Sequence, residues 1–91
     1  MQLNVITGPA GSGKTRCLRE MATAQGMESR ILNGSCITGT ALHRQVSRQL
    51  YRGAKEVFID ECHPNLIGLI QTWGRRFPAG VVLHVVQQDR P

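Results

Sequence analysis

Cysteines and long apolar runs are both scarce in this sequence, and their scarcity excludes several classes of protein. The three cysteines, Cys17, Cys36 and Cys62, form no C-x-x-C pair and no Cys/His cluster of the kind that binds zinc. An odd number of widely spaced cysteines is typical of a reducing cytoplasm rather than of a disulfide framework. No apolar run approaches the roughly 20 residues that span a bilayer, and the first residues, MQLNVITG, lack the positive region of a signal peptide. We therefore expect a cytoplasmic protein that has no membrane partner.

Acidic residues are also few, and the chain is basic as a result. Six Asp and Glu residues face eleven Lys and Arg residues, which leaves a formal net charge of +5. A surplus of this sign favours contact with nucleic acid, acidic proteins or anionic ligands. The length of 91 residues predicts a single domain over residues 1–91, and no internal repeat or low-complexity tract divides it.

Apolar stretches alternate with helical patterns along the whole chain. Strands are expected at residues 3–7, 30–36, 56–60 and 81–87, and helices at residues 14–25, at residues 40–52 and after Pro64. The third helix is expected to turn five apolar side chains toward the core, namely Leu66, Ile67, Leu69, Ile70 and Trp73. This alternation predicts βαβ units and an α/β fold with a parallel sheet.

The segment from Gly8 to Thr15 matches the motif G-x-x-x-x-G-K-[ST] without a gap. Its glycines permit backbone angles and close approaches that a Cβ would block, so amide N–H groups can point at phosphate oxygens beside the following helix. Lys14 is expected near the β- and γ-phosphates as a catalytic residue, and the Thr15 hydroxyl is expected to ligate magnesium. The predicted cofactor-binding residues are Gly8, Pro9, Ala10, Gly11, Ser12, Gly13, Lys14, Thr15 and Arg16.

An acidic pair, Asp60 and Glu61, directly follows the apolar run Val-Phe-Ile. The run places Asp60 at the carboxyl end of a buried strand, where open α/β sheets bind their ligands. Asp60 is predicted to hold magnesium through water, and Glu61 is predicted to polarise the attacking water as general base. Adjacent side chains of an extended strand point to opposite faces, so both can serve one site only if the chain turns there. An exposed strand end is the alternative interpretation.

Together the two segments resemble the Walker A and Walker B motifs of the P-loop ATPases. The acidic residue directly after the Walker B aspartate resembles the additional-catalytic-glutamate branch, which includes RecA-like ATPases, AAA+ proteins and helicases. Asp60-Glu61-Cys62-His63 matches the DExH box of superfamily 2 helicases. The resemblance implies a three-layer P-loop NTPase core whose mostly parallel sheet has about four strands in the order 1-4-3-2. It also implies ATP and Mg²⁺ as cofactors.

The same resemblance implies a polar sensor at the carboxyl end of the fourth strand. Gln87 and Gln88 lie there, and Gln88 is the predicted catalytic member; a polar strand end is the alternative. His63 either couples Glu61 to this sensor or begins a helix. His84, inside an apolar strand, is expected to be a core residue with satisfied hydrogen bonds.

Arginines stand out at two places. Arg44, Arg48 and Arg52 repeat every four residues and form either a ridge that meets nucleic-acid phosphates or a solvated helix face. Arg75 and Arg76 follow the third helix and are either charged helix-end residues or arginine fingers that act on a neighbour's nucleotide. Nucleic acid is thus one candidate partner, and a second copy or another protein that supplies an arginine is the other.

Three functions are compatible with these motifs. The leading one is a magnesium-dependent ATPase that acts with a partner or as an oligomer. A small-molecule kinase is the second, because the loop also resembles that of the thymidine kinases, although this chain has no place for their zinc-binding lasso. The third is a module that binds ATP as an assembly signal without hydrolysing it, although such a module has no need of Glu61.

The outer edge of the first strand is expected to be covered by a second chain or by the tail after Gln88.

Overall fold

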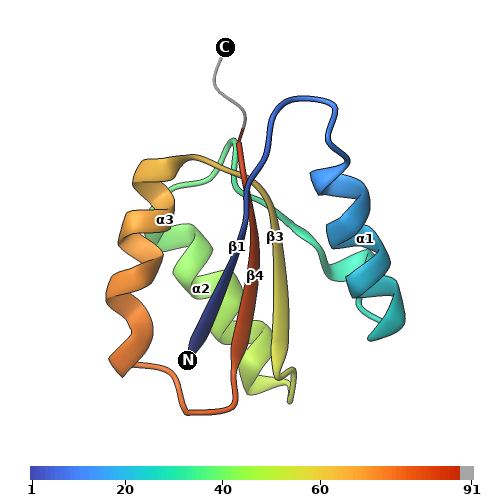
Figure 1. Ribbon diagram of the computed structural model, residues 1–91. Helices are drawn as coiled ribbons and strands as arrows, with labels where there is room; N and C mark the ends of the chain where they lie inside the picture. The colour runs from blue at the N-terminus through green and yellow to red at the C-terminus, as the bar shows by residue number, and fades with distance from the viewer. Residues whose placement is uncertain (89–91) are drawn as a thin grey trace.

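Four parallel strands form the centre of the fold in the computed structural model, which describes residues 1–88 (Figure 1). The strands are β1 (Gln2–Ile6), β2 (Leu32–Asn33), β3 (Glu56–Cys62) and β4 (Val82–Gln87). Their order across the sheet is β1-β4-β3-β2, and every neighbouring pair is parallel. The α/β fold and the strand order 1-4-3-2 are therefore confirmed.

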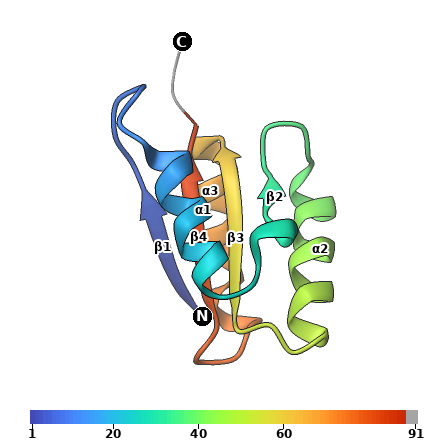
Figure 2. The same cartoon turned by 90° about the vertical axis from the view of Figure 1, so that its right-hand side faces the viewer.

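Helices cover both faces of the sheet and make three layers (Figures 1 and 2). The helix α1 (Lys14–Ala24) lies on one face, and α2 (Gly39–Tyr51) and α3 (Pro64–Gln71) lie on the other. Two short 3₁₀ helices, η1 (Glu28–Arg30) and η2 (Thr72–Arg75), connect these elements to the strands. None of the helices within residues 1–88 is long and apolar enough to cross a membrane.

Each face of the sheet packs its own apolar core. Leu18 and Ala22 of α1 pack with Phe58 and Val86 of the sheet. The larger core lies beneath α2 and α3 and includes the inward side chains Leu42, Val46, Ile67, Ile70, Val57, Ile59, Leu83 and Val85. Alternate residues of β3 and β4 thus face opposite layers, as a strand that is buried on both sides requires.

The second strand is much shorter than the sequence predicts. Residues 30–36 were expected to be extended, but only Leu32–Asn33 pair with β3. The Asn33 Oδ1 atom accepts hydrogen bonds from the Ser35 backbone N–H (2.8 Å) and from the Ser35 hydroxyl (2.7 Å). An Asn side chain that bonds the backbone two residues ahead bends the chain into a turn, and the strand ends there.

The core face of the third helix is also narrower than expected. Ile67, Ile70 and Trp73 are buried, but Leu69 is 43% exposed and is not a core residue. Leu69 instead lies against Gly39 at the start of α2, where much of its side chain stays exposed. The prediction for Leu69 was therefore wrong.

His84 is a core residue whose hydrogen bonds are satisfied, as the sequence predicts. Its ring is 7% exposed and stacks on Phe58 at 5.0 Å between ring centroids. The Asn4 side-chain amide lies 3.0 Å from Nδ1, and a Glu56 carboxylate oxygen lies 2.9 Å from Nε2. A neutral ring that carries its proton on Nε2 satisfies both contacts, because the amide then donates to Nδ1 and Nε2–H donates to the carboxylate.

Alanine substitutions at two glycines should change the stability of the fold in opposite directions. Gly34 is buried against β3, and a Cβ there would lie 3.1 Å from Cys62 Cα and 3.3 Å from the Asp60 carbonyl oxygen. We expect Gly34→Ala to lower the free energy of unfolding by about 1–3 kcal/mol, because backbone atoms have little freedom to move away. Gly68 lies in α3 with open space around its Cα, so Gly68→Ala should raise the same quantity by about 0.5–1 kcal/mol.

Urea unfolding of the wild type and the two variants measures both changes. An unfolding midpoint for Gly34→Ala at or above that of the wild type would contradict the close packing of Gly34 against β3.

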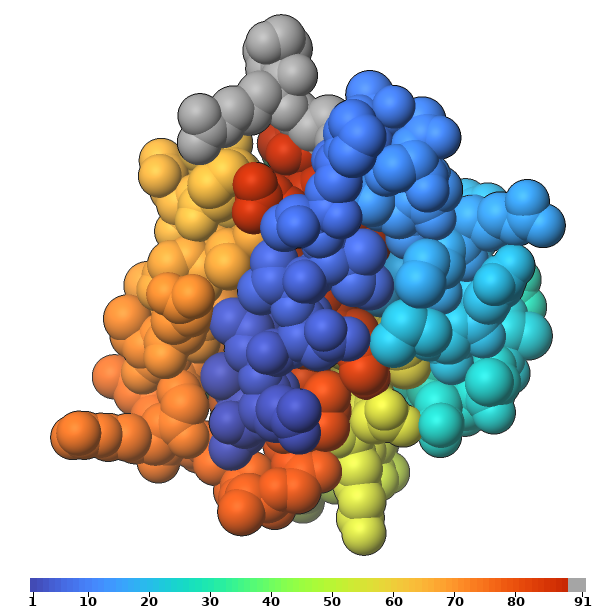
Figure 3. Space-filling model, viewed as in Figure 1, coloured from blue at the N-terminus to red at the C-terminus, as the bar shows by residue number. Residues whose placement is uncertain are grey.

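The outer edge of β1 has no strand beside it in the described part of the chain. In the space-filling view, the residues of β1 lie at the surface between α1 and α3 (Figure 3). The predicted cover by the tail after Gln88 concerns residues 89–91, which lie outside the described residues.

Candidate nucleotide site

The loop between β1 and α1 carries the predicted phosphate-binding residues. Gly13 begins α1 with a φ of +84°, a left-handed conformation that favours glycine. A Cβ on Gly8 would lie 2.8 Å from the Ser12 hydroxyl, so a larger residue there would force the Ser12 side chain to move. No side chain caps α1, and its first turn carries no acidic residue. The first amide groups of the helix are therefore open to an anion.

Lys14 and Thr15 extend from the first turn of α1 toward the ends of the strands. The Lys14 Nζ atom donates to the Gly8 carbonyl oxygen at 2.7 Å, which holds the ammonium group over the loop. The Thr15 hydroxyl donates to Asp60 Oδ1 at 3.1 Å, across 45 residues of sequence. The fold thus joins the two predicted motifs directly.

A β-bulge in β3 lies at the acidic pair, Asp60 and Glu61, and interrupts the regular alternation of side chains along the strand. Ile59 pairs with Val85 and Cys62 pairs with Gln87, so β3 carries two residues where β4 carries one. Glu61 has a φ of +51°, which is uncommon for a residue other than glycine. The Asp60 Oδ1 atom accepts the Glu61 backbone N–H at 2.9 Å and supports this conformation.

The bulge changes the direction of the side chains that follow it. Strict alternation would place Cys62 on the face opposite Ile59, yet both pack in the core beneath α2 and α3. Asp60 contacts Thr15, and Glu61 lines the same hollow as Lys14 and Thr15. Asp60, which bonds to Thr15, and Glu61, which lines the hollow, therefore lie beside one another at the loop, as the sequence required of a chain that turns there.

The hollow beside the loop has a volume of about 240 Å³. Its lining joins the loop, the bulge and the end of β4, and consists of Lys14, Thr15, Glu61, Val86, Gln87 and Gln88. The Gln88 backbone N–H donates to the Cys62 carbonyl oxygen at 2.8 Å, which holds the end of β4 against the end of β3. Gln88 therefore lies where a sensor was expected, and Gln87 and Val86 join it in the lining. Only Val86 was not considered from the sequence, because an apolar strand residue carries no signal of a site.

Cys62 contributes to the site through its backbone alone. Its side chain is fully buried, and burial raises the pKa of the thiol from 9.0 to about 11. The thiol is therefore protonated at neutral pH and is unsuited to act as a nucleophile or as a metal ligand. The other two cysteines, Cys17 and Cys36, are exposed elsewhere.

Several predicted residues are absent from the lining of the hollow. Arg16 instead pairs with Glu20 on the exposed side of α1, with 3.2 Å between Nε and Oε1. His63 is the residue that begins α3, and its Nδ1 atom accepts the Asn65 backbone N–H at 3.0 Å. The structure thus supports the interpretation of His63 as the residue that begins a helix, rather than as a link between Glu61 and the sensor.

The two arginines near the end of the third helix are distant from the loop within one chain. Arg75 ends η2 and Arg76 follows it, at the opposite end of the sheet from the segment between β1 and α1 (Figure 1). Neither residue lines the hollow. Within residues 1–88, the structure therefore brings no arginine side chain into the lining of the hollow.

The groups at the site are of the types that bind a phosphate chain and position a water molecule to attack it. The open amide groups belong to the start of α1, the hollow beside it is lined by Lys14, Glu61, Gln87 and Gln88, and Asp60 bonds to Thr15. Comparisons with protein families, with curated proteins and with solved structures found no match for this chain. The motifs and their geometry are thus the basis for assigning a function.

Proposed function

We propose that this protein binds ATP with magnesium at the loop of Gly8 to Thr15 and hydrolyses the γ-phosphate. The observation that carries the proposal is the convergence of Lys14, Thr15 and Glu61 on one hollow, with Asp60 bonded to Thr15. ATP is preferred over GTP because the sequence has no N-K-x-D string for reading guanine.

Phosphate binding relies on the loop and on α1. The open amide groups at the start of α1 and the Lys14 ammonium supply positive charge to the β- and γ-phosphates. The same positive charge stabilises the negative charge that develops as the γ-phosphate leaves. This dual use makes Lys14 both a binding and a catalytic residue.

A magnesium ion fits the oxygen atoms of Thr15 and Asp60, which already lie 3.1 Å apart. No cluster of three or more His, Cys, Asp or Glu side chains within residues 1–88 forms a metal site without help. Magnesium commonly takes one or two protein ligands and completes its shell with water and phosphate oxygens. Once bound, it would neutralise charge on the phosphate oxygens.

Glu61 is the proposed general base for the attacking water. The bulge turns its carboxylate toward the hollow, where Gln87 and Gln88 also lie. A carboxylate accepts the water's proton, and a glutamine amide both donates and accepts hydrogen bonds. Gln88 is thus proposed to orient the water or to contact the γ-phosphate.

Assembly belongs to the same proposal. The outer edge of β1 presents unpaired backbone groups within the described chain, and such edges are commonly covered. Among residues 1–88, no arginine lines the hollow either. We propose that a second copy, or a protein partner, covers β1 and supplies an arginine to the hollow.

Phosphate release at increasing protein concentration tests the proposal. We expect the rate per chain to rise with concentration and then to level off, because an arginine supplied in trans typically accelerates hydrolysis by about 10³–10⁵-fold. Parallel reactions should contain a nucleoside acceptor such as thymidine. A phosphorylated acceptor in place of free phosphate would support the kinase instead, and tight ATP binding without turnover would support the assembly module.

A further inference from the structure

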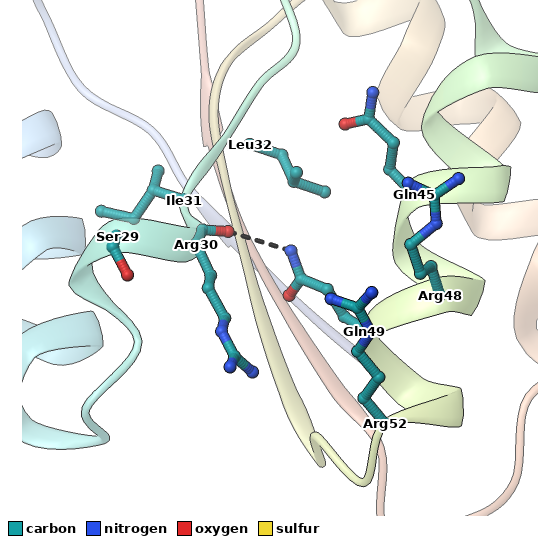
Figure 4. A pocket seen from close by; sticks show the side chains of 8 residues that line it. All are labelled: Ser29, Arg30, Ile31, Leu32, Gln45, Arg48, Gln49 and Arg52. Carbon is teal, nitrogen blue, oxygen red and sulfur yellow. Dashed lines mark hydrogen bonds between the residues drawn. The ribbon is translucent and has the colours of Figure 1, made fainter.

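A basic groove lies on the side of the molecule away from β1. It has a volume of about 270 Å³ and separates α2 from η1 and β2. Figure 4 shows Arg30 on one side of the groove and Arg48 and Arg52 on the other. The Gln49 side-chain amide donates to the Arg30 carbonyl oxygen at 3.0 Å and ties the two sides together.

The positive charge of this groove is not neutralised by neighbouring acids. No Asp or Glu within residues 1–88 lines it, and the three guanidinium groups make no ion pair with a carboxylate of these residues. A second hollow, which Arg30, Arg52 and Lys55 help to line, extends the basic surface toward the start of β3. That lining also contains one carboxylate, Glu56, which accepts from the neutral His84 ring at 2.9 Å and keeps its charge, so three cations face one anion there.

An exposed aromatic ring adjoins the arginines. Tyr51, near the end of α2, is 94% exposed. Residues at spacings of four and seven share one face of a helix, so Arg44, Arg48 and Tyr51 form a continuous strip beside the groove. The helix α2 contains no acidic residue. Charge and an accessible ring are thus combined on one surface.

We infer that this surface, from Arg30 across Arg48 and Arg52 to Tyr51, binds single-stranded nucleic acid. Arginines one helical turn apart are separated by about 6 Å along α2, which lets a flexible strand place successive phosphates on them. The Tyr51 ring offers a face on which an unpaired base can stack. A duplex keeps its bases stacked on one another, and an acidic peptide has no base to place on the ring.

This surface is separate from the nucleotide site. The order β1-β4-β3-β2 puts β2 at the edge opposite β1, and Figure 2 shows α2 beside β2 on that side. None of the residues that line the groove lines the hollow at the loop. The inference therefore goes beyond ATP hydrolysis and is testable without nucleotide.

Fluorescence anisotropy of a labelled oligothymidylate of about 20 nucleotides tests the inference, with the nucleotide-free chain titrated at several salt concentrations. Arg48→Gln/Arg52→Gln should weaken binding by about 10- to 30-fold near 0.1 M salt and reduce the salt slope by about 1.4, because two phosphate contacts are lost. Tyr51→Ala should weaken binding by about 5- to 150-fold and leave the salt slope unchanged, whereas Tyr51→Phe should keep the affinity.

Arg75→Gln/Arg76→Gln is the matched control, because it removes two exposed arginines from another surface. We expect it to retain the affinity of the wild type. Equal losses in the two double variants would overturn the inference, since net charge alone would then explain binding. It would also be overturned by wild-type protein that fails to bind, by equally tight binding of a duplex, or by polyglutamate that competes as well as unlabelled oligothymidylate.

Discussion

Glu61→Gln should reduce the steady-state rate of ATP hydrolysis by about 10²–10⁴-fold, the usual effect of losing a general base. Glutamine keeps the shape of the side chain and its place in the bulge, but its amide does not accept the proton of the attacking water. Glu61 is exposed at the hollow, and the hydrogen bond that holds its place in the bulge comes from its backbone N–H to Asp60 at 2.9 Å, not from its side chain. ATP affinity should therefore survive, and the variant should accumulate in its ATP-bound form.

Phosphate release and ATP affinity, measured at matched magnesium concentration, check this result. Glu28→Gln is the control, because it removes one exposed carboxylate in η1, away from the hollow. Asp60→Ala should behave differently from Glu61→Gln and weaken magnesium-dependent ATP binding, since Asp60 contacts Thr15. Hydrolysis by Glu61→Gln at the wild-type rate would place water activation on another residue.

Lys14→Ala should abolish measurable MgATP binding, which corresponds to a loss of about 100-fold or more in affinity. The ammonium group is the cation held over the loop by the Gly8 carbonyl oxygen at 2.7 Å. Its removal leaves the charge of the β- and γ-phosphates without its main side-chain partner, and charge-assisted hydrogen bonds are the strong ones.

Isothermal titration calorimetry with MgATP measures this loss. Lys55→Ala provides the control, because it removes the chain's other lysine, which lies in the second basic hollow away from the loop. The two variants carry the same net charge, so a difference between them reports on position. Unchanged MgATP affinity in Lys14→Ala would show that Lys14 does not contact the bound nucleotide.

Motif spacing and periodicity predicted most of the strands and helices, and the resemblance to P-loop ATPases predicted the strand order. The run Val-Phe-Ile before Asp60 marks β3, and the glycine-rich segment after β1 marks the start of α1. Two local details were mispredicted. The Asn33 side chain ends β2 early by bonding Ser35, and Leu69 is 43% exposed although it lies between core positions. The pattern of hydrophobic residues does not show whether a side chain bonds to the backbone or which side of a short helix is buried.

The sequence by itself determined the glycine-rich segment proposed to bind phosphate and the identity of the acidic pair, because both depend on residue types at short spacings along the chain. Only the tertiary structure decided that Asp60 and Glu61 both lie beside Thr15 and the hollow. Alternation along a strand would separate them, and the bulge that unites them arises from the pairing of Ile59 with Val85 and of Cys62 with Gln87. The contact between Thr15 and Asp60 and the groove between Arg30 and Arg52 likewise depend on strand order, which joins segments that are distant in the chain.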